Sequence, residues 1–283
     1  MLWTLLVVSL IGSAHFKDTR ARCQIEDIRC NGTTSQSTDY IDNIDNSHIP
    51  YIADRAIDGD LNKCAHTLQL NNSWWRIDLL GVYRISNITI YNIKQENADM
   101  SGARIYIGNS RQNNGTANPL RRTIQNFITN DFNYYVFNTT VSGRYITVFL
   151  PEVKNLILCE VMIFGIIKES SFELVKEKKT WEDALYYCRD RDMDLASIVD
   201  EDTQVWAELE AQKADTPFVW LGLRYTCTLN FWFWVDDQRL EFNRWAPNSK
   251  TEDCDMSVAM DRQADHLWYS KLDDKMFNFI CAK

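Results

Sequence analysis

The sequence predicts two domains: an all-β sandwich of the jelly-roll type, followed by an α+β domain. Short β-rich runs separated by Asn, Gly, Asp and Ser clusters continue from Arg29 to Phe164, and no convincing amphipathic helix interrupts them. The composition changes after Phe164, where helical spacing first appears. A length of 283 residues also suffices for two domains of ordinary size, each with its own core.

The N-terminal residues 1–14 form an apolar run that ends in small residues, which is typical of a cleaved secretory signal peptide. A buried N-terminal strand is the alternative. Eight cysteines suit the oxidising compartment that secretion implies. N-x-Ser/Thr sequons for glycosylation agree with a secreted, extracellular glycoprotein. Their asparagines are Asn31, Asn71, Asn87, Asn114 and Asn138.

The net charge of −9 argues against nucleic acid or an anionic membrane as a partner. No later run is long enough to predict a membrane span. The sequence has neither a His-Glu-x-x-His zinc pattern nor a Gly-x-Ser-x-Gly elbow, so it predicts a protein that is not an enzyme.

The first domain is expected over residues 16–165, and its clearest strand runs from Trp74 to Asn92. Ile88 and Ile90 occupy one face of that strand, while Asn87, Thr89 and Tyr91 occupy the other, which is the period of a half-buried strand. The adjacent Trp74 and Trp75 are expected in the core. Further strands are expected at ARIYIG, YYVFN, GRYITVFLP and LILCEVMIFG.

A linker is expected at 166–171, and the second domain at 172–283. Thr180 precedes a predicted helix, and Asp183 stands where a capping box places an acid. A second helix is expected at 201–213, followed by β-rich runs at VWLGLRY and FWFWVDD. The aromatic residues of FWFWV are a candidate surface for recognising a protein.

The first domain resembles the fucolectin (F-type lectin) family. The motifs that carry the resemblance stand in family order and are RAIDGD, CAHT, WWRIDLL, SGARIYIGNS, GRYITVFLP and LCEV. Members of this family are jelly-roll domains, similar to the F5/8 type C domain, that bind fucose beside a structural calcium. The resemblance therefore implies carbohydrate binding with calcium as the cofactor.

By this resemblance, Asp58 and Glu160 contribute carboxylates to the calcium, a cation that prefers several oxygen ligands. Backbone carbonyls complete the set, from Arg55, Asp60, Lys63 and Cys159. The stretch from Asp60 to Cys64 is shorter than in the family, which affects the carbonyls of Asp60 and Lys63 most. A simpler interpretation is that Asp58 caps a turn beside Gly59.

The resemblance places one His and two Arg on the sugar. His66 matches the histidine, but Lys94 stands in the region of the first arginine, and Asp99 and Met100 stand where the second is expected. A flexible ammonium does not reproduce the planar donor fork of an arginine, so we expect ordinary fucose binding to be lost here. His66 is alternatively a polar residue beside a disulfide.

The second domain resembles the C-type lectin domain through TWEDALYYC, DLASI, VWLGL, FWFWVDD, NRWAP, EDC and FNFIC. Sugar-binding members hold calcium with Glu-Pro-Asn or Gln-Pro-Asp, a later Glu, and Trp-Asn-Asp. This chain instead has Ala246-Pro247-Asn248, Glu252 and Trp268-Tyr269-Ser270. Too few oxygen ligands remain for a calcium cage, so Glu252 and Asp253 are expected in a solvated loop.

The two resemblances imply disulfides between Cys64 and Cys159 and between Cys188 and Cys281. Cys227 with Cys254, and Cys23 with Cys30, are expected for the other cysteines, although these two pairings stay open.

The leading hypothesis is a secreted lectin of innate immunity that binds cell-surface glycans or glycoproteins through several weak sites, with a homo-oligomer as one form of the protein. The alternative is a protein-binding scaffold in which both sugar sites have degenerated.

Overall fold

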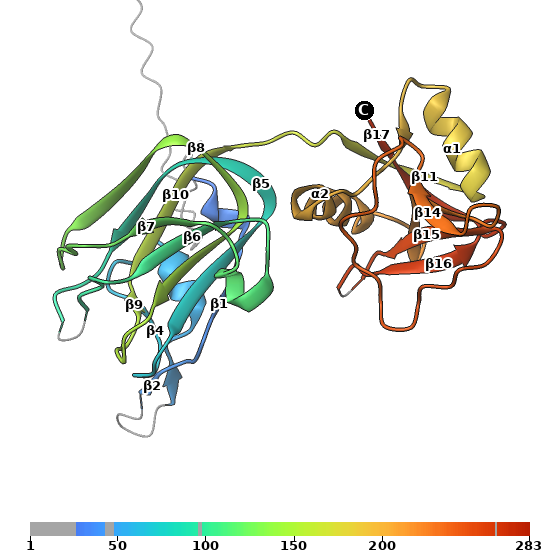
Figure 1. The fold of residues 1–283 in the computed structure, drawn as a ribbon. Coiled ribbons are helices and arrows are strands. Elements are labelled where there is room, and N and C mark those ends of the chain that lie inside the picture. The colour runs from blue at the N-terminus through green and yellow to red at the C-terminus, as the bar shows by residue number, and fades with distance from the viewer. Residues whose placement is uncertain (1–26, 43–47, 96–97, 264) are drawn as a thin grey trace, which may run out of the picture.

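A computed structural model describes residues 27–42, 48–95, 98–263 and 265–283, arranged as two domains (Figure 1). The predicted signal peptide lies outside the described residues. The first domain is built on a sheet of order β1-β5-β8-β6-β7, with β10 paired to β5. Its strands are β1 (Thr33–Gln36), β5 (Ser73–Tyr91), β6 (Arg104–Gly108), β7 (Leu120–Thr123), β8 (Phe132–Leu150) and β10 (Glu160–Ile167).

Shorter elements close the ends of this sandwich. β2 (Ile41–Asp42) pairs with β3 (Ile49–Pro50), and β4 (Ala65–His66) pairs with β9 (Ile157–Leu158). The 3₁₀ turns are η1 (Arg29–Asn31), η3 (Ala53–Ile57) and η4 (Gln112–Gly115).

Alternating burial explains why β5 and β8 form the centre of the sandwich. Trp75, Ile77 and Leu79 of β5 are buried, and each alternates with a more exposed neighbour. Register shifts in the pairing of β5 with β8 fall between Asp78 and Tyr83 and again between Ile85 and Asn87. Such irregularities bend a strand, so β5 and β8 can contribute side chains to different parts of one core.

The second domain packs two helices around a sheet of order β11-β17-β13-β15-β16, with β12 paired to β17 and β14 paired to β13 (Figure 1). The helices are α1 (Trp181–Arg189) and α2 (Glu201–Ala211). The strands are β11 (Phe172–Lys179), β12 (Asp194–Leu195), β13 (Phe218–Thr226), β14 (Phe231–Trp234), β15 (Met256–Asp261), β16 (Trp268–Leu272) and β17 (Phe277–Ala282).

Side-chain caps start both helices. The Thr180 hydroxyl accepts the N–H of Asp183 at 3.2 Å before α1. Before α2, Asp200 and Thr203 form a reciprocal capping box. β10 continues to Ile167, so the strand takes in the first two residues of the expected linker.

Disulfides join Cys64 to Cys159, Cys188 to Cys281 and Cys227 to Cys254. Cys30 is also disulfide-bonded. Its expected partner, Cys23, lies outside the described residues.

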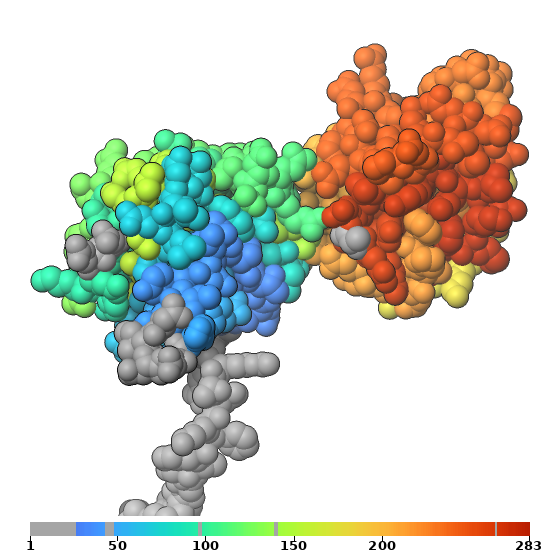
Figure 2. Space-filling model, turned by 90° about the horizontal axis from the view of Figure 1, so that it is seen from below, coloured from blue at the N-terminus to red at the C-terminus, as the bar shows by residue number. Residues whose placement is uncertain are grey.

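Helix α2 contacts the first domain, and the space-filling view shows the two domains touching (Figure 2). Asn109 donates its side-chain N–H to Asp202 at 2.6 Å. The buried Arg144 holds Asp78 within its own domain by two hydrogen bonds of 2.7 and 2.8 Å. The same guanidinium lies 3.7 Å from Glu208 of α2. Arg144 therefore ties two strands together and faces the second domain.

Replacing Arg144 with Met is expected to lower the free energy of unfolding of the first domain by about 3–5 kcal/mol, because it leaves Asp78 and Glu208 without their shared cation. Urea denaturation followed by tryptophan fluorescence measures the loss. Arg121→Met, at an exposed position of β7, is the control. Equal small effects of the two substitutions would contradict the role assigned to Arg144.

Candidate functional site

An aromatic cluster surrounds His66 where β4 pairs with β9. The His66 ring stacks on Tyr40 at a centroid distance of 4.6 Å and meets Tyr51 edge-on at 5.9 Å. Its Nε2 atom is buried and has no hydrogen-bond partner in the described part of the chain. Burial lowers the pKa of His66 below its ordinary value, so the ring is neutral at pH 7. We name Tyr40, Tyr51 and His66 the His66 cluster.

Arg55 brings a guanidinium to this cluster. It lies 4.4 Å above the ring of Tyr51, in cation–π geometry, and its side chain is partly exposed. The family resemblance implies only a backbone role for Arg55, and no sequence motif singles out Tyr40 or Tyr51. Residue spacing gave no signal for this arrangement, because the tyrosines come from segments remote from His66 in the sequence.

Asn92 organises the loop in which the fucolectin family, but not this chain, has its sugar-binding arginines. The buried Asn92 amide donates to the carbonyls of Ala98 at 3.0 Å and Ile157 at 2.7 Å. Lys94 is exposed and forms no ion pair with any described residue. Asp99 accepts hydrogen bonds from the backbone N–H and hydroxyl of Ser101. The structure therefore joins His66 to the tyrosines, and Lys94 remains in solvent.

Asp58 is engaged in a turn. Its carboxylate accepts the backbone N–H of Asp60 at 2.8 Å, and Gly59 between them has a φ of +80°, which favours glycine. This geometry is the turn cap that the simpler interpretation described. The carbonyl of Asp60 accepts the N–H of Lys63, whose ammonium also pairs with the Asp60 carboxylate at 3.0 Å. In addition, Arg55 donates its backbone N–H to Ile52.

Glu160, the other expected carboxylate ligand, is buried and ion-paired with Arg29. Arg29 also pairs with Asp27 at 2.8 Å and donates to the carbonyl of Val161 at 3.1 Å. Burial lowers the pKa of Arg29, while the charges of Asp27 and Asp58 act in the opposite sense. A positive charge thus already lies within reach of Asp58 and Glu160, the two carboxylates expected to bind calcium.

Glu160 has the Arg29 guanidinium as its ion-pair partner, and Asp58 accepts one backbone hydrogen bond. Both carboxylate oxygens of Glu160 are buried and accept no hydrogen bond from a described residue, so the charge of Arg29 is what compensates this carboxylate. Among the described residues, no group of three or more His, Cys, Asp or Glu side chains is arranged to hold a metal ion.

The corresponding loop of the second domain is closed by its own hydrogen bonds. Ser249 donates its hydroxyl to the carbonyl of Trp268 at 2.8 Å, and the Ser270 hydroxyl accepts the N–H of Thr251 at 2.6 Å. Glu252 is exposed and pairs with Lys250 at 2.6 Å, and the hydrogen bond from Lys250 lowers the pKa of Glu252.

Two further residues of this loop have structural roles. Asn248 has a φ of +59°, as expected in a tight turn, and Asp253 caps the N–H of Cys254. The geometry agrees with the solvated loop that was expected for Glu252 and Asp253.

The aromatic run FWFWV is not an exposed surface as a whole. In β14 the burial alternates, so Trp232 and Trp234 are in the core while Phe231 is exposed. The expectation of an exposed aromatic patch was wrong for the tryptophans, because strand geometry places successive side chains on opposite faces.

The chain matches two family models, one in each domain. Residues 55–148 match the model described as a NedA-like, galactose-binding domain, and residues 177–283 match the lectin C-type domain. These two folds define the chain as a protein of the non-enzymatic lectin class. None of the helices in the described residues is long and apolar enough to cross a bilayer.

The chain belongs to the fucolectin family, and a C-type lectin domain follows its fucolectin domain. Fucolectin-4 of Anguilla japonica is 35% identical over 177 residues, which cover 59% of this chain and 94% of that protein. The C-type lectin lectoxin-Phi1 of Philodryas olfersii is 31% identical over 121 residues, covering 40% of this chain and 76% of the relative.

A solved structure of a fucolectin from the serum of Morone saxatilis, the striped bass, is 32% identical. The match covers 58% of each chain with a TM-score of 0.47.

The stability of the first domain is expected to fall as the pH drops below about 6.5. Burial lowers the pKa of His66 in the folded chain, so His66 is protonated more readily in the unfolded chain. Protonation at low pH therefore favours the unfolded chain. Melting temperatures between pH 8 and pH 5 test this expectation. His66→Phe keeps the stacked ring and should show a smaller loss, while His48→Phe, at an exposed position, should behave as wild type. Parallel curves for all three proteins would contradict the assignment.

Proposed function

We propose that this protein is a secreted lectin of innate immunity that binds fucose-type glycans on cell surfaces or glycoproteins. The observation that carries the proposal is the match to Fucolectin-4 over 94% of that relative's length. The lectin C-type domain in the second half supports the same class of activity. The net charge of −9 supports a glycan rather than a nucleic acid as the partner.

The His66 cluster is the proposed sugar site. Tyrosine rings offer flat apolar faces to the C–H groups of a sugar, and His66 supplies polar ring nitrogens. Arg55 provides a guanidinium beside Tyr51, and its hydrogen bonds to hydroxyl groups are charge-assisted. Lys94 is a second exposed cation of the same domain. Arg55 thus takes the role for which the sequence offers no arginine after Asn92.

Single-site affinity is expected to be weak, because Nε2 of His66 is buried and must become accessible before it contacts a hydroxyl. Linked or repeated weak sites gain avidity when they reach one surface together. The proposal therefore includes a homo-oligomer as the form that captures cells.

A scaffold that recognises protein is the second candidate. The burial of Nε2 favours it, since a sugar site with an inaccessible histidine is degenerate. Phe231 of β14, with 47% of its side chain exposed, is the aromatic group that such a surface would present.

Glycan-array binding of the secreted protein distinguishes the two functions. We expect fucosylated glycans to bind, and Arg55→Ala to reduce the signal by at least tenfold, since it removes a charge-assisted contact on the order of 1.5–3 kcal/mol. His66→Ala should reduce the signal by about two- to tenfold, because a hydrogen bond to a neutral ring is worth on the order of 0.5–1.5 kcal/mol. Arg84→Ala, at an exposed position of β5, is the control and should bind as wild type. An array without any glycan signal, together with Phe231-dependent capture of a purified glycan-free protein, would establish the scaffold instead.

We further propose that Arg29, and not calcium, supplies the positive charge at Glu160, because a second cation beside Arg29 would be repelled. We expect the wild-type melting temperature of this domain to be the same in calcium and in chelator. Arg29→Ala should destabilise the domain by about 3–5 kcal/mol, because it leaves Glu160 buried without a cation. Calcium should then restore part of that stability to the variant. A wild-type transition that rises with calcium would contradict the assignment.

A further inference from the structure

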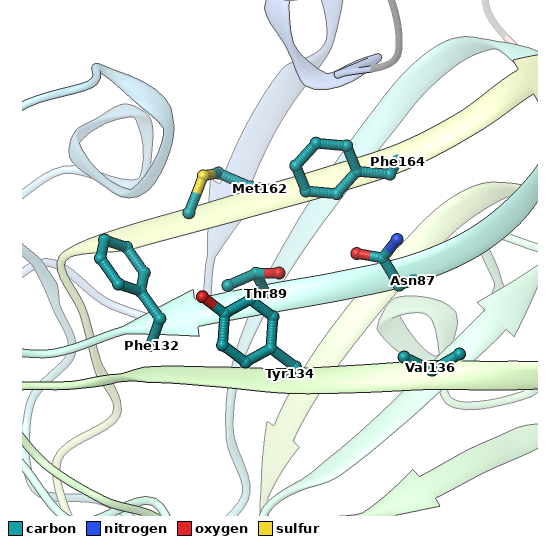
Figure 3. A pocket seen from close by; sticks show the side chains of 7 residues that line it. All are labelled: Asn87, Thr89, Phe132, Tyr134, Val136, Met162 and Phe164. Carbon is teal, nitrogen blue, oxygen red and sulfur yellow. The ribbon is translucent and has the colours of Figure 1, made fainter.

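The outer face of the first domain contains a hollow of about 480 Å³ over β10, β5 and β8 (Figure 3). Much of its lining is apolar. Tyr134 and Val136 are 69% and 56% exposed, although the outer face of an antiparallel sheet is usually polar. The opposite face of the same strands is core, with Ile88 and Ile90 of β5 fully buried. Large apolar side chains in this hollow are exposed to water. An exposed apolar patch of this kind indicates a surface that another group covers.

Asn87 lies on β5, the central one of the three strands that line the hollow. It stands directly opposite Val136 of β8 on one side and Phe164 of β10 on the other. Two residues further along β5, Thr89 lies opposite Tyr134. Directly opposed residues share one face of a sheet, so these side chains surround Asn87. Figure 3 shows them projecting from neighbouring strands around the hollow.

Asn87 is also the acceptor asparagine of the sequon Asn87-Ile88-Thr89. Its side chain is partly exposed, and its amide nitrogen donates to the Ser86 hydroxyl at 3.4 Å, near the outer limit of a hydrogen bond. The register shift just before Asn87 bends the strand at this point. The amide is therefore only weakly held by the protein and lies within an open, apolar surface.

We propose that Asn87 carries an N-linked glycan and that the first sugars of this glycan cover the hollow. The C–H faces of the N-acetylglucosamine residues pack on Tyr134 and Phe164, and their hydroxyl groups face water. The group that covers the hollow is thus a glycan attached to the chain itself.

The covalent step joins the amide nitrogen of Asn87 to the anomeric carbon of a lipid-linked oligosaccharide diphosphate. The bond from that carbon to the diphosphate oxygen breaks, the lipid diphosphate leaves, and the amide proton passes to a base of the transferase. The inference rests on the secretion included in the proposed function, because the donor occurs in the secretory pathway.

The chain offers a matched control for this modification. Asn114 belongs to the sequon Asn114-Gly115-Thr116, and it lies exposed in η4 next to the exposed Asn113. A glycan at Asn114 is attached outside the lining of the hollow, so its removal should leave Tyr134 unchanged.

The test uses the full chain secreted from glycosylating animal cells, with wild type, Asn87→Gln, Thr89→Val and Asn114→Gln compared. Glycopeptide mass spectrometry should find Asn87 occupied in wild type and Asn114→Gln. Hydroxyl-radical footprinting should show Tyr134 several-fold more reactive in Asn87→Gln and Thr89→Val than in the other two proteins. Thr89→Val keeps the asparagine and the side-chain shape, so agreement between the two sequon variants excludes a local change in packing as the cause.

Four results would overturn the inference. Asn87 found empty while other sequons are occupied would overturn it and leave the proposed lectin function standing. An occupied Asn87 with unchanged Tyr134 reactivity would show that the glycan does not cover the hollow. Concentration-dependent protection of Tyr134 in Asn87→Gln, with a dimer in sedimentation, would identify a second copy as the cover. Absence of glycan from every sequon of the secreted chain would also overturn it, whereas failure of the glycan array alone would leave this inference intact.

Discussion

The disulfide between Cys64 and Cys159 is the constraint on which the candidate site depends. It joins β4 to the end of β9, and each of these strands is only two residues long. A ladder of two residue pairs is marginal by itself, whereas a cross-link over 95 residues removes on the order of 4–5 kcal/mol of loop-closure entropy from the unfolded chain. His66 lies two residues after Cys64, and Glu160 directly follows Cys159. The bond therefore fixes the histidine against its tyrosines and the carboxylate against Arg29.

Local pattern was sufficient to predict the framework. Alternation of apolar residues predicted β5, and the cap at Thr180 predicted the start of α1, because both signals arise between neighbours in the sequence. Reasoning from residue type failed for FWFWV. The aromatic composition suggested a surface, but the alternation of the strand places Trp232 and Trp234 inside. Periodicity describes which face a residue occupies, and it is a better guide to exposure than residue type.

The contacts that decide the chemistry could not be predicted, since they join remote segments. Arg29 reaches Val161 across 132 positions, and no local signal at Arg29 marks it as the cation beside Glu160. Tyr40 likewise meets His66, although β2, β3 and η3 lie between them in the sequence. Motif resemblance correctly predicted the family, but a motif contains only the residues that relatives share. Arg29 lies outside the motifs that carry the resemblance, so those motifs gave no indication that it pairs with Glu160.

The position of the second domain relative to the first determines whether surfaces of both domains can bind their ligands at the same time. Figure 1 shows β4 and β9 at one end of the first domain, while α2 approaches beside β5. The buried Arg144 faces Glu208 of α2, and separating the domains would leave a desolvated charge without its partner. The domains are thus coupled by contact as well as by the short connection at 168–171. Coupled domains present their surfaces at a set spacing, so avidity depends on whether the spacing of the ligands matches it.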